Sequence, residues 1–180
     1  MIKNNLKYLI LSILLLFIGC DELSKIPVNI PIPLEFNAKG TQTSFIASDS
    51  FCLSEFSEWR DNQDELNSVK FLSASYWTLG STPNLSADIN FTIYDKEDNV
   101  LFSFDMENVN AQEYTDKAYI YSLTQEQIQA VNNYVSNLSN NDKCFSYKFS
   151  VKNVTGDKNN NGQFELNGKV ELLFEADVNL

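Results

Sequence analysis

Histidine is absent from this chain of 180 residues, and arginine occurs once, at Arg60. Without histidine there is no Ser-His-Asp or Cys-His catalytic site and no histidine-ligated zinc or iron. Bidentate recognition of a phosphate or carboxylate by a guanidinium group could come only from Arg60. An enzyme with this composition would depend on carboxylates, lysine, tyrosine or a bound metal, and the sequence contains no nucleophile motif. We therefore expect a protein that is not an enzyme.

Positive charge is also scarce, because 13 Lys and Arg face 24 Asp and Glu, for a formal net charge of −11. An acidic surface disfavours nucleic acid, whose phosphates need basic contacts. The same surface favours solubility and attracts cations or basic partners. We therefore expect no nucleic-acid partner, and a solvated acidic surface is the simplest explanation of the charge.

One long apolar run is present, Tyr8–Ile18, and it follows two lysines near the start of the chain. Its length is well short of the roughly 20 residues that span a bilayer as a helix. Lysines, an apolar core and a small residue at Gly19 are the features of a secretory signal peptide over residues 1–19. The ending Leu16-Phe17-Ile18-Gly19-Cys20 resembles the lipobox of bacterial lipoproteins, in which the cysteine is lipidated and becomes the new N-terminus.

This resemblance implies an exported protein held on a membrane by acyl chains such as palmitate on Cys20. Residues 20–25 would form a short tether, and residues 26–180 a single domain, a length that suits one hydrophobic core. The outer membrane or the cell surface is the favoured location. The inner membrane and the periplasmic face stay open, because an acid at Asp21 has different sorting meanings in different bacteria.

Two further cysteines, Cys52 and Cys144, lie in the expected domain. Exported proteins meet oxidising conditions, so we expect these two cysteines to form a disulfide. Closing a loop of 144 − 52 = 92 residues would add about 4 kcal/mol in the chain-entropy model. The alternative is two buried thiols that pack as small hydrophobic side chains.

Apolar residues alternate with polar ones through most of the domain, which is typical of β-strands. Three prolines on the polar side of the first strand predict that it lies at a sheet edge. The two predicted strands on either side of the polar loop at residues 95–99 should form a hairpin. Residues 57–66 are predicted to form a loop with one helical turn. The predicted strands span residues 26–36, 41–48, 69–79, 85–94, 100–106, 117–122, 145–151 and, as a final pair, 164–180.

One segment, Thr124–Leu138, has helical spacing instead, and Thr124 with Gln127 fits a capping box. Short antiparallel strands with turn-rich connections indicate a β-sandwich. The predicted fold is therefore mainly β: an antiparallel β-sandwich of about eight strands with one amphipathic helix over about residues 125–138.

A metal site is one interpretation of the segment from Asp157 to Glu165. Its oxygen-bearing side chains and Gly162 resemble the spacing of EF-hand calcium loops, so Ca²⁺ is a candidate ligand. A hairpin turn needs the same asparagines and glycine for positive φ angles, and this alternative stays open. The candidate calcium ligands are Asp157, Asn159, Asn161 and Glu165.

The aromatic residues, 13 Phe, 8 Tyr and 2 Trp, suggest a second candidate site. Tyr76 and Trp77 are adjacent in a predicted strand, so their side chains must point to opposite faces of the sheet. An outward ring could stack on a sugar, although core packing is the commoner use of aromatic side chains.

These patterns predict a membrane-anchored lipoprotein of the cell envelope with a non-catalytic role in binding, adhesion or assembly. Its partner would be an envelope protein or a glycan. The alternative is a carbohydrate-binding module with an aromatic platform and a structural calcium. A carboxylate-dependent hydrolase is less favoured, because no pair of acids stands out by position.

Overall fold

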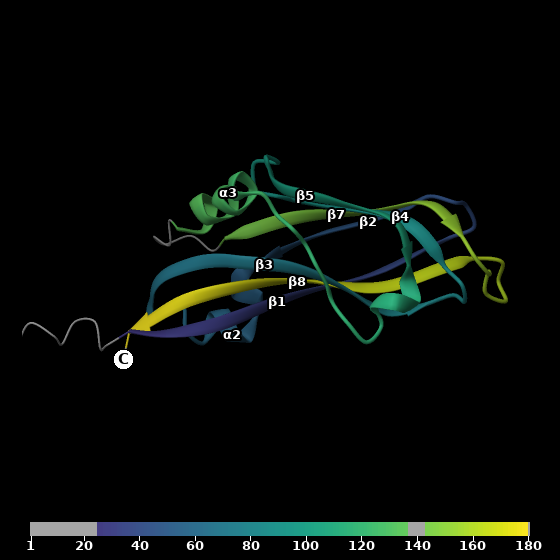
Figure 1. Cartoon of the computed structure of the whole chain (residues 1–180). Helices are drawn as coiled ribbons and strands as arrows, with labels where there is room; N and C mark the ends of the chain where they lie inside the picture. The colour runs from purple at the N-terminus through teal and green to yellow at the C-terminus, as the bar shows by residue number, and fades with distance from the viewer. Residues whose placement is uncertain (1–24, 137–142, 180) are drawn as a thin grey trace, which may run out of the picture.

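Two four-stranded antiparallel sheets pack face to face in the computed structural model, which describes residues 25–136 and 143–179 (Figure 1). The strands are β1 Lys25–Gly40, β2 Phe45–Cys52, β3 Leu66–Ser81, β4 Ser86–Tyr94, β5 Val100–Asn110, β6 Tyr119–Ile120, β7 Cys144–Thr155 and β8 Phe164–Asn179. The helical segments are the 3₁₀ turns η1 Leu53–Glu55 and η2 Ala111–Tyr114 and the α-helices α2 Ser57–Arg60 and α3 Gln125–Ser136. The predicted antiparallel β-sandwich with one amphipathic helix is confirmed.

The strand order identifies the sandwich as a jelly roll. Sheet A has the order β1-β8-β3-β6, and sheet B has the order β2-β7-β4-β5. The eight strands correspond to one long antiparallel hairpin, in which β1 pairs with β8, β2 with β7, β3 with β6, and β4 with β5. Each sheet contains two of these four pairs. Wrapping this hairpin into two layers adds the β3–β8 and β4–β7 neighbours and produces the jelly-roll topology.

The core lies between the sheets and is rich in aromatic rings. Phe36 from sheet A stacks on Phe149 from sheet B with ring centroids 3.6 Å apart. Phe71 of β3 stacks on Phe102 of β5 in the same way, at 5.7 Å. Burial of each such ring stabilises the fold by about 1.5–3 kcal/mol. The many phenylalanines of the sequence are therefore mainly core residues.

β1 is the edge strand that its prolines predicted. It pairs only with β8 within sheet A, and its even-numbered residues from Ile30 to Phe36 are buried. Pro27, Pro31 and Pro33 lie at the alternate positions, where the missing N–H groups cost no ladder bond. An edge without these donors is a poor template for pairing with another chain.

Three strand predictions differ from the structure, and the first is the strand 117–122, of which only Tyr119–Ile120 form β6. The predicted final pair over residues 164–180 is a single strand, β8, because Gly168 continues the strand instead of starting a turn. A Cβ atom at Gly168 would overlap the Phe36 ring, so glycine is there to make room for the core. The predicted strand 41–48 is shifted to Phe45–Cys52, since residues 41–44 form the connection from β1.

α3 closes the side of the sandwich between β3 and β5 (Figure 1). The capping box is formed as expected: the backbone N–H of Gln127 donates to Thr124 Oγ1, and that of Thr124 donates to Gln127 Oε1. Polar side chains then join the helix to both sheets. Asn132 Oδ1 accepts the N–H of Phe71 on β3 at 2.7 Å, and Gln127 Nε2 donates to the carbonyl of Ser103 on β5 at 2.8 Å.

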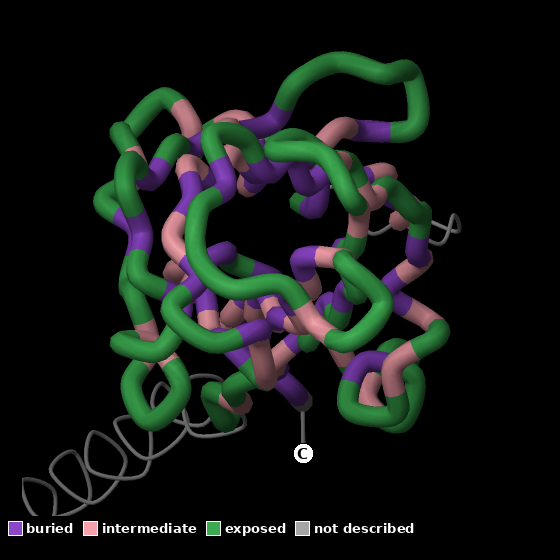
Figure 2. The backbone as a smooth tube through the Cα atoms, turned by 90° about the vertical axis from the view of Figure 1, so that its right-hand side faces the viewer, coloured by how far each residue is buried: buried purple, intermediate pink, exposed green. Residues whose placement is uncertain are grey.

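The two ends of the sandwich differ. At the terminal end, Lys25 of β1 lies opposite Asn179 of β8, and α3 lies nearby (Figure 1). The opposite loop end carries the connections 41–44, 82–85 and 156–163, whose backbone is largely exposed (Figure 2). Hydrogen bonds join these connections: the Asp157 N–H donates to the Pro83 carbonyl, and Lys158 Nζ donates to the Thr41 carbonyl, both at 3.0 Å.

Candidate functional site

Cys20, the predicted lipidation site, and the predicted signal peptide before it lie outside the described residues. No helix within residues 25–136 and 143–179 is both long and apolar enough to cross a membrane. Anchoring through Cys20 therefore stays a prediction from the sequence.

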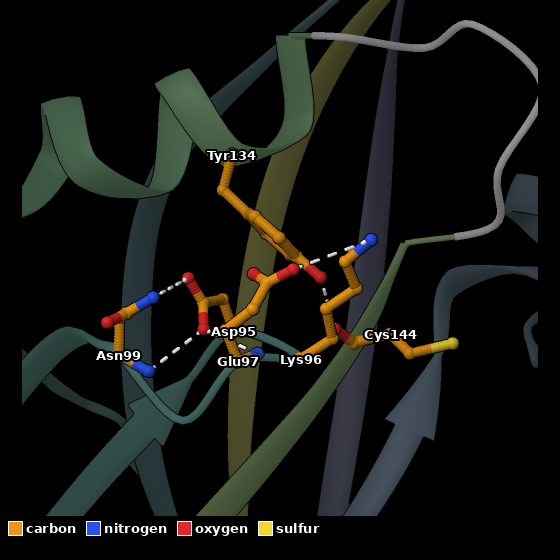
Figure 3. Close-up of polar contacts among 6 residues, drawn as sticks. All are labelled: Asp95, Lys96, Glu97, Asn99, Tyr134 and Cys144. Carbon is orange, nitrogen blue, oxygen red and sulfur yellow. Dashed lines mark hydrogen bonds and ion pairs between the residues drawn. The ribbon is translucent and has the colours of Figure 1, made fainter.

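Cys52 and Cys144 are joined by a disulfide in the structure. They lie opposite each other at the last register position of the β2–β7 pair, at the terminal end of sheet B. Next to the bridge, the Tyr134 hydroxyl of α3 donates to the Cys144 carbonyl at 2.6 Å (Figure 3). Partial burial raises the pKa of Tyr134, and Lys143 Nζ lies 5.4 Å from its ring centroid. Helix, bridge and strand thus form one structural unit.

The hairpin loop between β4 and β5 is organised by the buried carboxylate of Asp95 (Figure 3). Asp95 Oδ1 accepts the N–H groups of Glu97 and Asn99, and Oδ2 accepts Asn99 Nδ2, each at 2.9 Å. Burial raises the pKa of Asp95, but these hydrogen bonds outweigh burial and hold it below its ordinary value. Asp95 is therefore an ionised turn former.

The predicted calcium loop has the hydrogen bonds of a turn. Asn159 Oδ1 accepts the N–H groups of Asn161 and Gln163, both at 3.0 Å, and Gly162 has a φ of 70°. Asp157 Oδ2 accepts Asn84 Nδ2 at 2.9 Å, and Glu165 lies in β8 opposite Lys39. Among the described residues, no three His, Cys, Asp or Glu side chains are grouped as metal ligands.

Tyr76 and Trp77 point to opposite faces of sheet A. Tyr76 is fully buried, its hydroxyl lies 2.9 Å from Thr78 Oγ1, and burial raises its pKa to about 12. Trp77 is half-buried on the outer face, where Lys169 Nζ lies 5.2 Å from the ring centroid. Lys169 also pairs with Glu171 at 3.0 Å. The two residues that the sequence grouped together therefore belong to different environments.

The outer face around Trp77 also carries unsatisfied polar atoms. Trp77 Nε1 and Asn167 Oδ1 are both buried and have no hydrogen-bond partner within the described residues. Beside Asn167 is a hollow of about 350 Å³, which Leu79 and Asn37 also line. Leu79 is 53% exposed. This surface combines apolar and polar contacts, but Lys169 already contacts the ring that a ligand would use.

A larger hollow, of about 470 Å³, lies on the outer face of sheet B and was not predicted from the sequence. We call it the sheet B depression. Tyr147 and Asp49 border it, but the Tyr147 hydroxyl donates to the Glu35 carbonyl, and Asp49 accepts the Ser50 N–H. The other lining residues are Ser48, Ser50, Tyr94, Asp98, Ser146 and Lys148.

Strand register explains how the depression forms. Ser50, Ser146 and Tyr94 lie side by side across β2, β7 and β4, and Ser48 and Lys148 form the next row. The serine side chains are short, so the surface above them is hollow, whereas the neighbouring Tyr94 and Lys148 side chains are longer and form its borders. Asp98 is brought in by the β4–β5 loop, where it has a φ of 63°. No local sequence pattern indicates this convergence, because three distant strands supply it.

A third hollow, of about 190 Å³, bears on the hydrolase hypothesis because Asp88, Asp105 and Glu107 line it. The N–H of Asn108 and Asn153 Nδ2 donate to the Asp88 carboxylate and hold its pKa below the ordinary value. A general acid at neutral pH needs a raised pKa instead. Asp88 is therefore suited to hold the turns around it rather than to donate a proton.

No protein-family model and no curated protein sequence matches this chain. Solved virus structures have a similar backbone. Desmodium yellow mottle tymovirus aligns with a TM-score of 0.44 and 10% identity, over 87% of this chain and 83% of its own. The infectious bursal disease virus VP2 subviral particle aligns with a TM-score of 0.43 and 8% identity over 83% of this chain. The alignment covers 32% of the VP2 chain, and similarity at this level assigns no function.

Proposed function

We propose that this chain is a lipid-anchored, non-catalytic binding domain of a bacterial cell envelope, on the outer membrane or the cell surface. The observation that carries the proposal is the lipobox-like ending at Cys20, five residues before β1 begins at Lys25. An acylated Cys20 would therefore hold the terminal end of the sandwich close to a membrane. The absence of histidine from the sequence supports a role in binding rather than catalysis.

Metabolic labelling in a bacterial host tests the anchor. The full chain should incorporate an alkyne analogue of palmitate and sediment with membranes, whereas Cys20→Ser should lose the label and leave the membrane fraction. A Cys52→Ser/Cys144→Ser variant is the matched control, because it removes two cysteines but keeps Cys20. Label that persists in Cys20→Ser, or membrane attachment without Cys20, would contradict the proposal.

Carbohydrate binding through an aromatic platform is the second candidate function. Its supporting observation is the position of Trp77, half-buried on the outer face of sheet A beside the polar side chain of Lys169. An aromatic ring with adjacent hydrogen-bonding groups suits a sugar, which has both C–H faces and hydroxyls. Trp77→Ala should abolish retention on an immobilised glycan if this platform is used, and unchanged retention would exclude it.

A further inference from the structure

We propose that the sheet B depression binds one neutral sugar unit of a glycan, with Tyr94 as the ring that packs against the sugar. The inference rests on the binding role proposed above and gives that role a site and a ligand class. It concerns a different face of the molecule from Trp77, so the two surfaces can be tested separately.

Five polar side chains that line the depression have no hydrogen-bond or ion-pair partner among the described residues. No hydrogen bond or ion pair links the side chains of Ser48, Ser146 or Lys148 to any other described residue. The Tyr94 hydroxyl and the Asp98 carboxylate are equally unpaired within that part of the chain. A hollow lined by several unpaired donors and acceptors is the arrangement that a polar ligand requires.

The neighbouring half of the same sheet face is different, although its composition is similar. There Asn90 Nδ2 donates to Asp105 Oδ1 at 2.9 Å, and the hydroxyls of Thr92 and Ser103 lie 2.8 Å apart. Asn90 Nδ2 also reaches Ser103 Oγ at 3.1 Å. Polar residues on β4 and β5 thus satisfy one another, whereas those on β2 and β7 in the depression do not. Pairing is therefore more extensive on β4 and β5 than in the depression, although the Lys152 side chain on the same face also has no hydrogen-bond or ion-pair partner among the described residues.

The chemistry of the lining favours a sugar over other ligands. Three serine hydroxyls and the Tyr94 hydroxyl can each donate and accept, which matches the hydroxyl groups of a sugar ring. The ammonium of Lys148 and the carboxylate of Asp98 offer charge-assisted hydrogen bonds to the same hydroxyls. The Tyr94 ring provides the apolar contact for a C–H face.

Charge then selects a neutral sugar. Within the depression, Lys148 is opposed by Asp49 and Asp98, and the whole chain carries a net charge of −11. An acidic glycan would meet repulsion from this field, and its binding would depend steeply on salt. Hydrogen bonds between charged side chains and neutral hydroxyls depend on salt much less. Weak salt dependence is therefore part of the proposal.

Affinity electrophoresis and biolayer interferometry with the full-length protein test the site. The protein is held in a zwitterionic detergent, because detergents with sugar headgroups would compete. The neutral probes are soluble β-glucan, mannan, galactan, xylan and chitin oligosaccharides, and polygalacturonate is the acidic comparison. We expect binding to at least one neutral probe, with an affinity that stays within about twofold as salt is raised.

The variants assign the binding to the depression. Tyr94→Ala and Lys148→Ala should each weaken binding about five- to tenfold. Lys148 is exposed, so its replacement leaves the core intact even if Tyr94→Ala lowers stability. Tyr119→Ala and Lys152→Ala are the matched controls: Tyr119 lies on β6 of sheet A, and Lys152 lies on the sheet B face outside the depression. Both controls should bind as the unmodified protein does.

Three results would overturn the proposal: no binding to any neutral probe, binding only to polygalacturonate, or loss of binding in Trp77→Ala with Tyr94→Ala unaffected. The anchor test is independent of these outcomes. A chain that binds a neutral glycan through Tyr94 but carries no lipid would refute the proposed anchoring and leave this site standing.

Discussion

At the scale of single residues, Gly168 is required by the packing of the core, because it leaves room for the Phe36 ring. Gly168 lies opposite Phe36 in the β1–β8 pair, and the Phe36 ring stacks on Phe149 of the other sheet. The ring covers the position that a Cβ atom would occupy. Glycine in a strand ordinarily weakens it, but here the aromatic ring fills the space over the backbone.

A methyl group at this position should therefore be destabilising. We expect Gly168→Ala to lower the free energy of unfolding by about 1–3 kcal/mol, because Phe36 must leave its stack. Gly80→Ala is the matched control in the neighbouring strand: its Cβ would have Asn167 Nδ2 at 3.8 Å as its nearest contact and should change stability by no more than about 0.5 kcal/mol. Urea unfolding measures both variants, and equal losses would refute the account.

Asp95 gives a prediction about pH. Its hydrogen bonds hold the folded-state pKa below the ordinary value, so its stabilising effect is present above the unfolded pKa of about 3.9 and is lost as the pH falls through the folded value. Asp95→Ala should cost about 1–2 kcal/mol at neutral pH, and the difference from the unmodified protein should shrink in acid. Urea unfolding at several pH values measures this. Glu97→Ala, in the same loop, should have little effect at any pH.

At the scale of elements, the disulfide determines how firmly β2 is held. β2 is a short edge strand that pairs only with β7, and the bridge joins the two strands at their last register position. The loop that the bridge closes spans 92 residues. Most of its stabilising effect should come from restricting the unfolded chain.

Cys52→Ser/Cys144→Ser should lower the free energy of unfolding by about 3–4 kcal/mol. The measurement is urea unfolding of the variant and of the unmodified protein with and without reductant. Reductant should bring the unmodified protein close to the variant and should leave the variant unchanged. Cys20→Ser is the matched control and should unfold as the unmodified protein does, because Cys20 takes no part in the disulfide between Cys52 and Cys144.

Among the elements of the fold, those with a local sequence pattern could be predicted from the sequence. Alternation with prolines identified β1 and its edge position, and the Thr124–Gln127 capping box identified the start of α3, because both are local patterns. The sequence predicted a pair of strands over residues 164–180 where the structure has one, and nothing local shows that Gly168 accommodates the Phe36 ring, which is more than a hundred residues away in the sequence. The sheet B depression was missed for a related reason: only the register of β2, β7 and β4 brings Ser50, Ser146 and Tyr94 into one row.

At the scale of the whole molecule, the long strands give the sandwich an axis. β1, β3 and β8 each contain 16 residues, which corresponds to about 50 Å at about 3.3 Å per residue. β1 begins at the terminal end, five residues after the proposed anchor in the sequence, and the joined loops 41–44, 82–85 and 156–163 lie at the other end. A domain with an excess of acids should also be repelled by anionic lipid headgroups.

The lipid-anchored protein should therefore stand with its loop end away from the membrane. With the full chain in anionic vesicles that contain acceptor lipids, energy transfer should be weak from a fluorophore at Asn160, in the loop end, and strong from one at Glu97, in the β4–β5 loop. A domain lying flat would give similar transfer from both positions, which would contradict this orientation. The difference should shrink in neutral vesicles or at high salt, because the repulsion that holds the domain upright is then absent or screened.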